Sequence, residues 1–589
     1  MRPVPLSPRS SGAALAALLV TLAPSLSHAQ AYQRIAPREP QAATSPSVTP
    51  PSAAAASSPS GAAILPVLKG LVFVPGMSAL QPAGLPAGSA SDGVHLAGTP
   101  LLNDPGFSRR MTAFIGRPLS FADLQKIIQI TTNWYRAHGR PFVSVVAPPQ
   151  NVGSGVVQIV VSEYRLGTVK AAGNRWFASD LLRRESGLVP GQPLTLGGVQ
   201  DDLDRLNSNP FRAVNTVFQP GAEPGVTDVV LQTQDRRPVR VYAAFDDAGA
   251  ANLGRTEWSI GAVWGNAFGL DQILSYQFTR GVSGRYDANA ASWSIPLPWH
   301  DTLLVFGSYA SETPDLGANF GERGTSGQAS ARYIHPLPRL TWPYAVSLTQ
   351  SLQVGYDFKT TNNNLEFGGA QVFASRAEVD QFPLVYDATL TDPRGQTGLE
   401  NQIVLSPGAL TGGNSNQAFG AIVPGATADY IYDRLSVTRT TYLPRGFSWS
   451  ARATGQVSDR NLMYSEQLGA GGMDSVRGYY TDTALGSRGL LVSQEVRAPA
   501  IALGGLLHLS PAAHDQEQLG LFWDYGHVEQ VKPIPNSVNA ADLSSVGVDL
   551  HATLDRYIDL KLDIGGQLRN APGADKRGVF ADVAMVVGF

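Results

Sequence analysis

The sequence contains no cysteine, and this absence excludes several classes of function at once. A disulfide scaffold, thiol chemistry and any metal site that needs thiolate ligands are ruled out. Charged residues make up only 15% of the 589 residues and the net charge is −3, so no basic stripe indicates a nucleic-acid partner. The nine histidines are scattered without ligand spacing. We therefore expect no bound metal and no nucleic acid.

Motifs of the common enzyme classes are also missing. The sequence has no GxSxG elbow, no HExxH pair and no GxxxxGK phosphate loop. The acidic pairs Asp201-Asp202 and Asp246-Asp247 are more typical of solvated surfaces than of catalytic carboxylates. We therefore expect no catalytic residues and no cofactor, and we interpret the protein as a non-enzyme.

Long apolar runs are absent as well, since no segment has the ~18 uninterrupted apolar residues of a transmembrane helix. The N-terminus instead carries Arg2 and Arg9, a short apolar stretch at 13–22 and small residues at 27–29. This pattern predicts a secretory signal peptide at residues 1–29, so the mature protein is exported. Its mean hydropathy is close to zero, which fits either a soluble protein or a transmembrane β-barrel.

The next 200 residues divide into a linker and two similar units. Residues 30–65 are rich in Pro, Ala and Ser, and the prolines limit any helix there to about two turns. Residues 66–163 and 164–237 each follow a strand–helix–helix–strand–strand plan, which predicts tandem α+β modules. In the first module a helix is expected over 121–137 and is followed by a strand at 142–146.

From residue 238 to 589 the hydrophobic period changes to two. Residues 557–568 and 579–589 place apolar side chains on one face and polar ones on the other, and aromatic residues cluster near strand ends. Strands of ~10 residues can cross a bilayer at a tilt. A soluble β-sandwich is the alternative, but its strands should be shorter and more evenly spaced. About seventeen strands can be counted, and because bacterial barrels have even numbers, we expect one segment between 360 and 406 to be a loop.

Counting strands back from the C-terminus orients the predicted barrel. If the chain ends on the periplasmic side, the connection 458–487 lies on the outer side. The tight turn near Asp555 then falls on the periplasmic side, where short turns belong. The connection 499–516 falls on the periplasmic side as well, and it is longer than the turns expected there.

Two short motifs stand out in the last quarter of the chain. The first, in the Gly-rich outer loop, comprises Val476, Arg477, Gly478 and Tyr479, and the second, in a strand, comprises Phe522, Asp524 and Gly526. Strand alternation directs Asp524 into the lumen. An arginine can grip a carboxylate with two bonds, so the motifs predict an Arg477–Asp524 pair that ties a long loop into the pore. A solvated arginine and an unrelated lumenal aspartate are the alternative.

Together these features resemble the outer-membrane transporters of two-partner secretion, the haemolysin secretion/activation proteins of ShlB/FhaC/HecB type, which are relatives of BamA-type insertases. The resemblance covers residues 65–589. It implies α+β POTRA (polypeptide-transport-associated) modules followed by an all-β transmembrane barrel of 16 antiparallel strands. It also implies that Arg477 and Asp524 are the family's loop arginine and strand aspartate. Phe589 would end the signal that the barrel-assembly machinery reads. Family members often carry a plug helix before the first module, and residues 30–65 offer no good candidate.

The resemblance implies a pore in the lipid of the outer membrane that takes an unfolded exoprotein, adhesin- or haemolysin-like, from the periplasm to the cell surface. The exoprotein would bind the POTRA modules as an added strand beside a helix. The substrate-binding candidates are Trp134, Tyr135, Phe142, Val143 and Val145. The alternatives are a BamA/TamA-type insertase, which usually carries more modules, and a passive porin or a surface hydrolase barrel.

Overall fold

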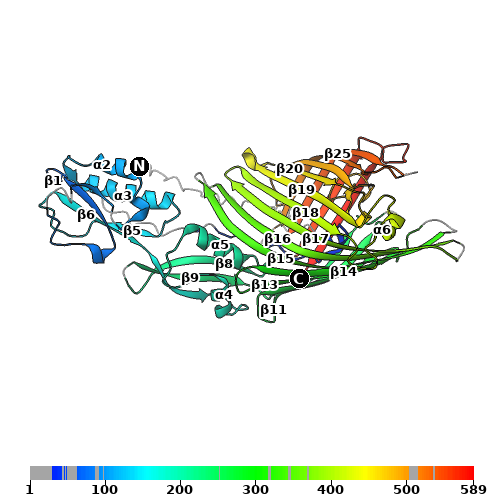
Figure 1. Cartoon of the computed structure of the whole chain (residues 1–589), viewed down its shortest axis with the longest axis horizontal. Helices are drawn as coiled ribbons and strands as arrows, with labels where there is room; N and C mark the ends of the chain where they lie inside the picture. The colour runs from blue at the N-terminus through cyan, green and yellow to red at the C-terminus, as the bar shows by residue number, and fades with distance from the viewer. Residues whose placement is uncertain are drawn as a thin grey trace, which may run out of the picture.

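Two small α/β modules lie in line with one large barrel (Figure 1). The computed structural model describes residues 30–42, 45–46, 48, 63–86, 92–96, 98–223, 225–250, 253–315, 320–342, 346–367, 370–502, 515–534 and 537–589. The predicted signal peptide, residues 1–29, lies outside them. Among the described helices, none has the length and apolar character needed to cross a membrane.

Module 1 is a four-stranded sheet covered by two helices. Its strands β2 (Gly70–Pro75), β3 (Gly93–His95), β5 (Val143–Val146) and β6 (Val156–Glu163) lie in the order β3-β2-β6-β5, and its helices are α2 (Pro105–Thr112) and α3 (Phe121–Ala137). Helix α3 begins at a capping box, in which the Asp123 N–H donates to Ser120 Oγ at 3.1 Å and the Ser120 N–H donates back to Asp123 at 3.3 Å. It ends where Gly139 adopts a φ of 73°.

Module 2 repeats the plan with three strands and two helices. Its elements are β7 (Arg165–Ala172), α4 (Ser179–Glu185), α5 (Leu196–Asn207), β8 (Arg212–Pro220) and β9 (Val226–Asp235), with the sheet order β7-β9-β8. Phe142 of module 1 belongs to the buried core of module 2, and its ring lies 4.7 Å from that of Phe218. The two modules therefore share apolar packing at their junction.

The rest of the chain forms a closed barrel of sixteen antiparallel strands, which confirms the predicted fold class. Its strands are β10 (Val239–Asp246), β11 (Glu257–Ala267), β12 (Gln272–Gly281), β13 (Tyr286–Pro296), β14 (Thr302–Glu312), β15 (Phe320–Trp342), β16 (Val346–Phe367), β17 (Ala370–Asp392), β18 (Gly395–Pro407), β19 (Asp429–Tyr442), β20 (Ser448–Ser458), β23 (Arg488–Arg497), β24 (Asp515–Glu529), β25 (Ala540–Leu554), β26 (Ile558–Gln567) and β27 (Val579–Gly588). The short helix α6 (Asn416–Ile422) lies between β18 and β19.

The expected loop between 360 and 406 is wrong, because that segment consists mostly of strands β16, β17 and β18. Strands β15, β16 and β17 contain 23, 22 and 23 residues, about twice the number needed to cross a bilayer. Strand β18 pairs with β17 only from Phe382 onward, so the outer parts of the long strands project beyond their neighbours. A strand length taken from the membrane thickness could not predict this projection.

The barrel closes along the pairing of β27 with β10, and β10 begins at the rim from which module 2 extends. The terminal Phe589 N–H donates to Val241 O at 2.9 Å, and the tight turn at Asp555 lies beside it, since Gly588 N donates to Tyr557 O at 2.8 Å. The chain end, this turn and the modules therefore share one rim, and the connection between β20 and β23 opens at the opposite rim.

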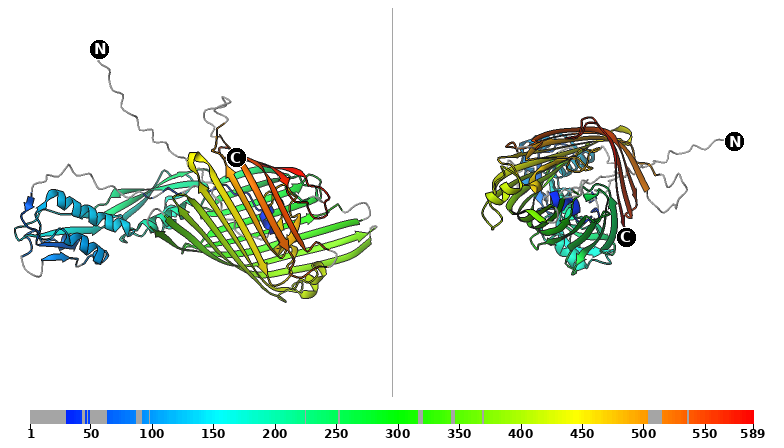
Figure 2. Two further views of the ribbon diagram at one scale, coloured as in Figure 1. Left: turned by 90° about the horizontal axis from the view of Figure 1, so that it is seen from above. Right: turned by 90° about the vertical axis from the view of Figure 1, so that its right-hand side faces the viewer.

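The expectation that residues 30–65 offer no candidate for a plug helix is wrong, although the helix found there is short enough to fit the limit of about two turns. Helix α1 (Gln30–Ile35) lies inside the barrel, where the dark blue ribbon is seen within the ring of strands (Figure 2). Tyr32 and Ile35 are buried against the wall, and the Tyr32 ring lies 4.6 Å from that of Phe306. Arg38 pairs with Asp246 at 2.8 Å. The helix has only six residues, too few to show a hydrophobic period in the sequence.

Module 2 is attached to the barrel rim by a buried ion pair. Arg212 of β8 binds both oxygens of Asp271, in the turn between β11 and β12, at 2.6 and 2.7 Å. Asn209 donates to the same carboxylate at 2.8 Å, and the guanidinium lies 4.8 Å from the centre of the Phe177 ring. The pair holds the last module in one orientation at this rim of the barrel.

Replacement of Asp271 by Ala should loosen module 2 from the barrel, because it leaves the Arg212 charge buried without a partner at a cost of about 3–5 kcal/mol. The measurement is the rate of limited proteolysis between module and barrel in detergent. Asp180→Ala is the control, since its pair with Arg183 is exposed and worth at most about 1 kcal/mol. Equal cleavage of the two variants would contradict the role of the pair.

Candidate functional site

The lumenal face of β24 carries the strand motif. Leu521 and Trp523 point outward with 65% and 39% of their surface exposed, whereas Phe522 and Asp524 are 4% and 0% exposed. Successive side chains of a strand point to opposite faces, so these values place Phe522 and Asp524 inside the barrel. An aspartate at this depth needs a partner, because a buried unpaired carboxylate is costly.

The loop motif reaches Asp524 because residues 459–487 fold back into the barrel. This inward loop contains the short helix η5 (Tyr464–Glu466) and a small hairpin of β21 (Leu468–Ala470) and β22 (Ala484–Gly486). Its apolar side chains pack on the wall in one buried cluster, whose members are Leu468, Ala470, Val476, Tyr479, Ala484, Val528 and Leu543. Apolar packing and hydrogen bonds therefore hold the loop together.

Arg477 and Asp524 form the contact at the tip of the inward loop, and we refer to them as the latch pair. The Arg477 guanidinium donates from Nε to Oδ2 at 2.8 Å and from Nη2 to Oδ1 at 3.0 Å. Its backbone N–H also donates to Oδ2 at 3.0 Å. The structure thus brings together the two residues that the motifs singled out, in the two-bond geometry that distinguishes arginine from lysine.

A second carboxylate completes the site, and the sequence did not indicate it. Glu495 of β23 accepts from Arg477 Nη1 at 2.8 Å and also pairs with Arg497. Burial alone would lower the pKa of Arg477, but the hydrogen bonds and charges of Asp524 and Glu495 raise it above its ordinary value, so the guanidinium stays charged. The strand register could have indicated Glu495, since it lies opposite Phe522 on the neighbouring strand.

Phe522 and the motif glycines fit the loop closely to the wall. The Arg477 guanidinium carbon lies 3.6 Å from the centre of the Phe522 ring, a cation–π contact. Gly478 has a φ of 83° and approaches the backbone of Gly565 so closely that an added Cβ would lie 2.9 Å from its carbonyl oxygen. At Gly526 an added Cβ would meet the Val476 side chain at 2.9 Å.

Tyr479 fixes the loop beyond the latch pair. Its hydroxyl lies 2.8 Å from the carbonyl of Ser544 and 2.7 Å from that of Arg569, and its side chain is 1% exposed. The Gln567 amide donates to Gly478 O at 2.9 Å. Every residue of the loop motif therefore contacts the wall formed by β23–β26.

The substrate-binding candidates in module 1 require a correction. Tyr135, Phe142 and Val145 are only 1%, 3% and 7% exposed, and Trp134 donates its indole N–H to Leu101 O at 3.0 Å within the module core. Tyr135, Phe142 and Val145 are therefore core residues, whereas Trp134 and Val143 are only partly buried against the core. Their helical and strand periods fit a core just as well, so the sequence could not separate the two roles. Strand β5 itself, with Val143, does lie at an edge of the sheet.

No metal-binding constellation is seen in the described part of the chain, where no group of three or more His, Asp or Glu side chains is placed to hold an ion. The site consists of ion pairs and hydrogen bonds between the inward loop and the barrel wall. Its chemistry is that of positioning a chain segment within the lumen.

Comparison with known proteins gives one consistent result. Residues 225–550, more than half of the chain, match the family model described as haemolysin secretion/activation protein ShlB/FhaC/HecB, and residues 90–163 match the ShlB-type POTRA domain. A heme/hemopexin transporter protein, HuxB of Haemophilus influenzae (strain 86-028NP), is 22% identical over 464 residues, covering 74% of this chain and 76% of its own.

Two solved structures share the fold. CdiB from Escherichia coli has a TM-score of 0.71 at 18% identity and covers 92% of this chain and 93% of its own. CdiB from Acinetobacter baumannii has a TM-score of 0.62 at 17% identity, with 95% and 96% covered. Both align across the modules and the barrel.

Replacement of Gly565 by Ala should displace the tip of the inward loop, because the added Cβ would lie 2.7 Å from the Gly478 Cα, a backbone atom that cannot rotate away. The adjacent Gly566→Ala is the matched control, since its Cβ would meet only Val546 O at 3.7 Å. The measurement is the maleimide labelling rate of a cysteine introduced at Ser475. Equal labelling in both variants would argue against the close approach.

Proposed function

Because the chain belongs to the ShlB/FhaC/HecB family of haemolysin secretion/activation proteins, we propose that its barrel is the pore through which a specific exoprotein partner is secreted. It is an outer-membrane two-partner secretion transporter with its POTRA modules in the periplasm. The observation that carries the proposal is the inward loop, which the latch pair holds inside a sixteen-stranded barrel whose entrance rim bears the modules.

The exoprotein would first bind as an extended strand at the edge of module 1. Among the described strands, β5 pairs with β6 alone. The Tyr164 N–H donates to Phe142 O at 2.9 Å, so in an antiparallel ladder the N–H and C=O groups of Val143 and Val145 point away from β6. These backbone groups, rather than side chains in a groove, can hydrogen-bond an added strand.

The latch pair would then keep the inward loop in one lumenal position while the exoprotein passes. Arg477 is 7% and Asp524 0% exposed, and among the described residues Arg477 is the one cation that pairs with Asp524. We infer that the loop sets the width and lining of the path on the side of β23–β26. A loop released from this wall would occupy the lumen in many positions and obstruct the path.

An insertase of BamA or TamA type is the second candidate function. Two modules favour secretion, because insertases of the BamA type usually carry more, and the relatives HuxB and CdiB are transporters by name. A passive porin would not need the modules. Phe589, whose side chain is 78% exposed at the chain end, is proposed as the terminal residue that the barrel-assembly machinery recognises.

Arg477→Ala and Asp524→Ala should each insert normally but secrete poorly, since removing one partner of a buried pair costs about 3–5 kcal/mol and frees the loop. Secreted exoprotein is measured in the medium, and barrel folding is checked by heat-modifiable gel mobility. Asp387→Asn is the control, because this lumenal carboxylate binds Gln353 and not the loop. Wild-type secretion by both alanine variants would refute the role of the latch pair.

Val143→Pro should weaken exoprotein binding, because proline removes one backbone donor from the open edge of β5. One hydrogen bond is worth about 1 kcal/mol, which corresponds to roughly fivefold weaker binding. Binding of the exoprotein's N-terminal region to the full-length transporter in detergent is the measurement. Ser144→Ala, which keeps its backbone paired with β6, should bind normally, and identical affinities for the two variants would exclude this edge.

A further inference from the structure

The inward loop carries a buried carboxylate of its own, Glu466, at its root in η5. Glu466 is 1% exposed, and its Oε1 accepts from Lys359 Nζ at 2.5 Å and from Ser465 Oγ at 2.8 Å. Its Oε2 accepts from Gln381 Nε2 and Tyr432 OH, each at 3.0 Å. One loop carboxylate thus receives four hydrogen bonds, three of them from the barrel wall.

Among the wall residues that bind Glu466, Lys359 carries a charge that Glu466 neutralises. Lys359 is 5% exposed, and among the described residues Glu466 is the one carboxylate with which it forms an ion pair. The neighbouring Asp357 is already paired with Arg332 at 2.7 Å. Without Glu466, the Lys359 ammonium would lie buried beside a carboxylate that another cation already neutralises. Burial alone would raise the pKa of Glu466, but Lys359 lowers it, so the pair is ionic.

The root and the tip of the loop are held by different parts of the barrel. Glu466 contacts β16, β17 and β19, and its backbone carbonyl accepts from Arg434 and Gln456, each at 3.1 Å. The tip is held instead by Asp524 of β24 and Glu495 of β23, which both bind Arg477. No hydrogen bond joins Glu466 to Arg477 in the described part of the chain.

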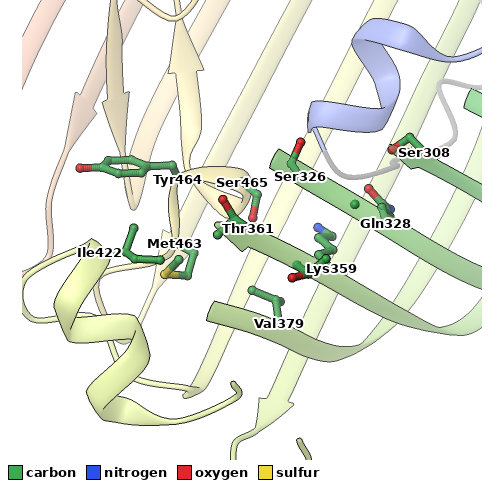
Figure 3. A pocket seen from close by; sticks show the side chains of 12 residues that line it. Ser308, Ser326, Gln328, Lys359, Thr361, Val379, Ile422, Met463, Tyr464 and Ser465 are labelled. Carbon is green, nitrogen blue, oxygen red and sulfur yellow. The ribbon is translucent and has the colours of Figure 1, made fainter. Parts of the chain in front are cut away.

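Apolar packing holds part of the root, because Leu462 and Met463 join a buried cluster with Val379 and Tyr432 of the wall, but the face at Ser465 is not packed. A cavity of about 100 Å³ separates it from the wall and is lined by Ser308, Ser326, Gln328, Lys359, Thr361, Val379, Met463 and Ser465 among others. Figure 3 shows Met463 and Ser465 on one side of this cavity and Lys359 and Val379 on the other. Beside this cavity the packing is incomplete, and there the hydrogen bonds of Glu466 connect the root to the wall.

We propose that Glu466 is a positioning residue that anchors the root of the inward loop to the β16–β19 wall, independently of the latch pair. The loop is then braced between two walls, and each anchor can be released alone. The proposal rests on the proposed function only for its effect on secretion, whereas the position of the loop can be measured without any exoprotein.

The absence of cysteine makes the test direct, because one introduced cysteine is the only thiol in the chain. Met463→Cys reports the root and Val476→Cys reports the tip, since both side chains are buried, with 2% and 0% exposed. Added to each reporter, Glu466→Gln should raise maleimide labelling of the root roughly tenfold or more and leave the tip unchanged, since it leaves Lys359 unpaired. Asp524→Ala should instead raise labelling of the tip and leave labelling of the root unchanged.

Lys359→Met is the second variant and should also raise labelling of the root, and Asp387→Asn on β17 should change neither reporter. Each variant is first shown to be folded by heat-modifiable gel mobility. Unchanged root labelling in both Glu466→Gln and Lys359→Met, or an equal rise at root and tip, would overturn the proposal. Failure of the wild-type protein to secrete a cognate exoprotein would count against the proposed function and leave the labelling result intact.

Discussion

The buried guanidinium of Arg477 is the constraint on which the site depends. A charge that cannot be neutralised by deprotonation must keep its partners, and these lie on β23 and β24 of the lumenal wall. The inward loop therefore has to enter the barrel, and the wall has to leave room for it. Gly478, Gly526 and Gly565 provide that room, and Phe522 supplies a ring surface beneath the guanidinium.

This arrangement divides the molecule into an entrance and an exit. The modules, the chain end and the turn at Asp555 lie at one rim, and the inward loop enters from the other. Module 2 is fixed to the entrance by the Arg212–Asp271 pair. An extended chain that binds the β5 edge would thus be presented to a pore whose lumen also contains α1 and the inward loop. Translocation has to pass or displace these segments, so their anchors are the parts of the protein that determine the path.

The period-two pattern predicted the barrel, and the two motifs together with the family resemblance predicted the contact of Arg477 with Asp524. Alternation along one strand settles which face a side chain is on, and the arginine fork needs a carboxylate. Alternation along one strand could not predict Glu495, because its contact depends on the register between β23 and β24. It could not predict Glu466 either, because the partners of Glu466 lie on strands far apart in the sequence. Lys359 lies 107 residues before Glu466.

The structure also differs from the sequence predictions where burial, rather than the hydrophobic period, decides the role of a residue. Tyr135 and Phe142 follow helical and strand patterns that suit a binding groove or a core, and the structure assigns them to cores. Helix α1 is too short for a detectable period, and β15–β17 are longer than membrane thickness predicts. Patterns of this kind predict which elements form, and they leave their contacts undetermined.

The central claim is that the loop tip is held in contact with β24, and one disulfide tests it most directly. An added Cβ at Gly526 would lie 2.9 Å from the Val476 Cγ2, within disulfide reach. In the variant Val476→Cys/Gly526→Cys, isolated from outer membranes, the account predicts a disulfide between the two introduced thiols, seen as a shift in non-reducing gel mobility that reductant reverses. Two free thiols that both react with maleimide in the folded barrel would contradict it.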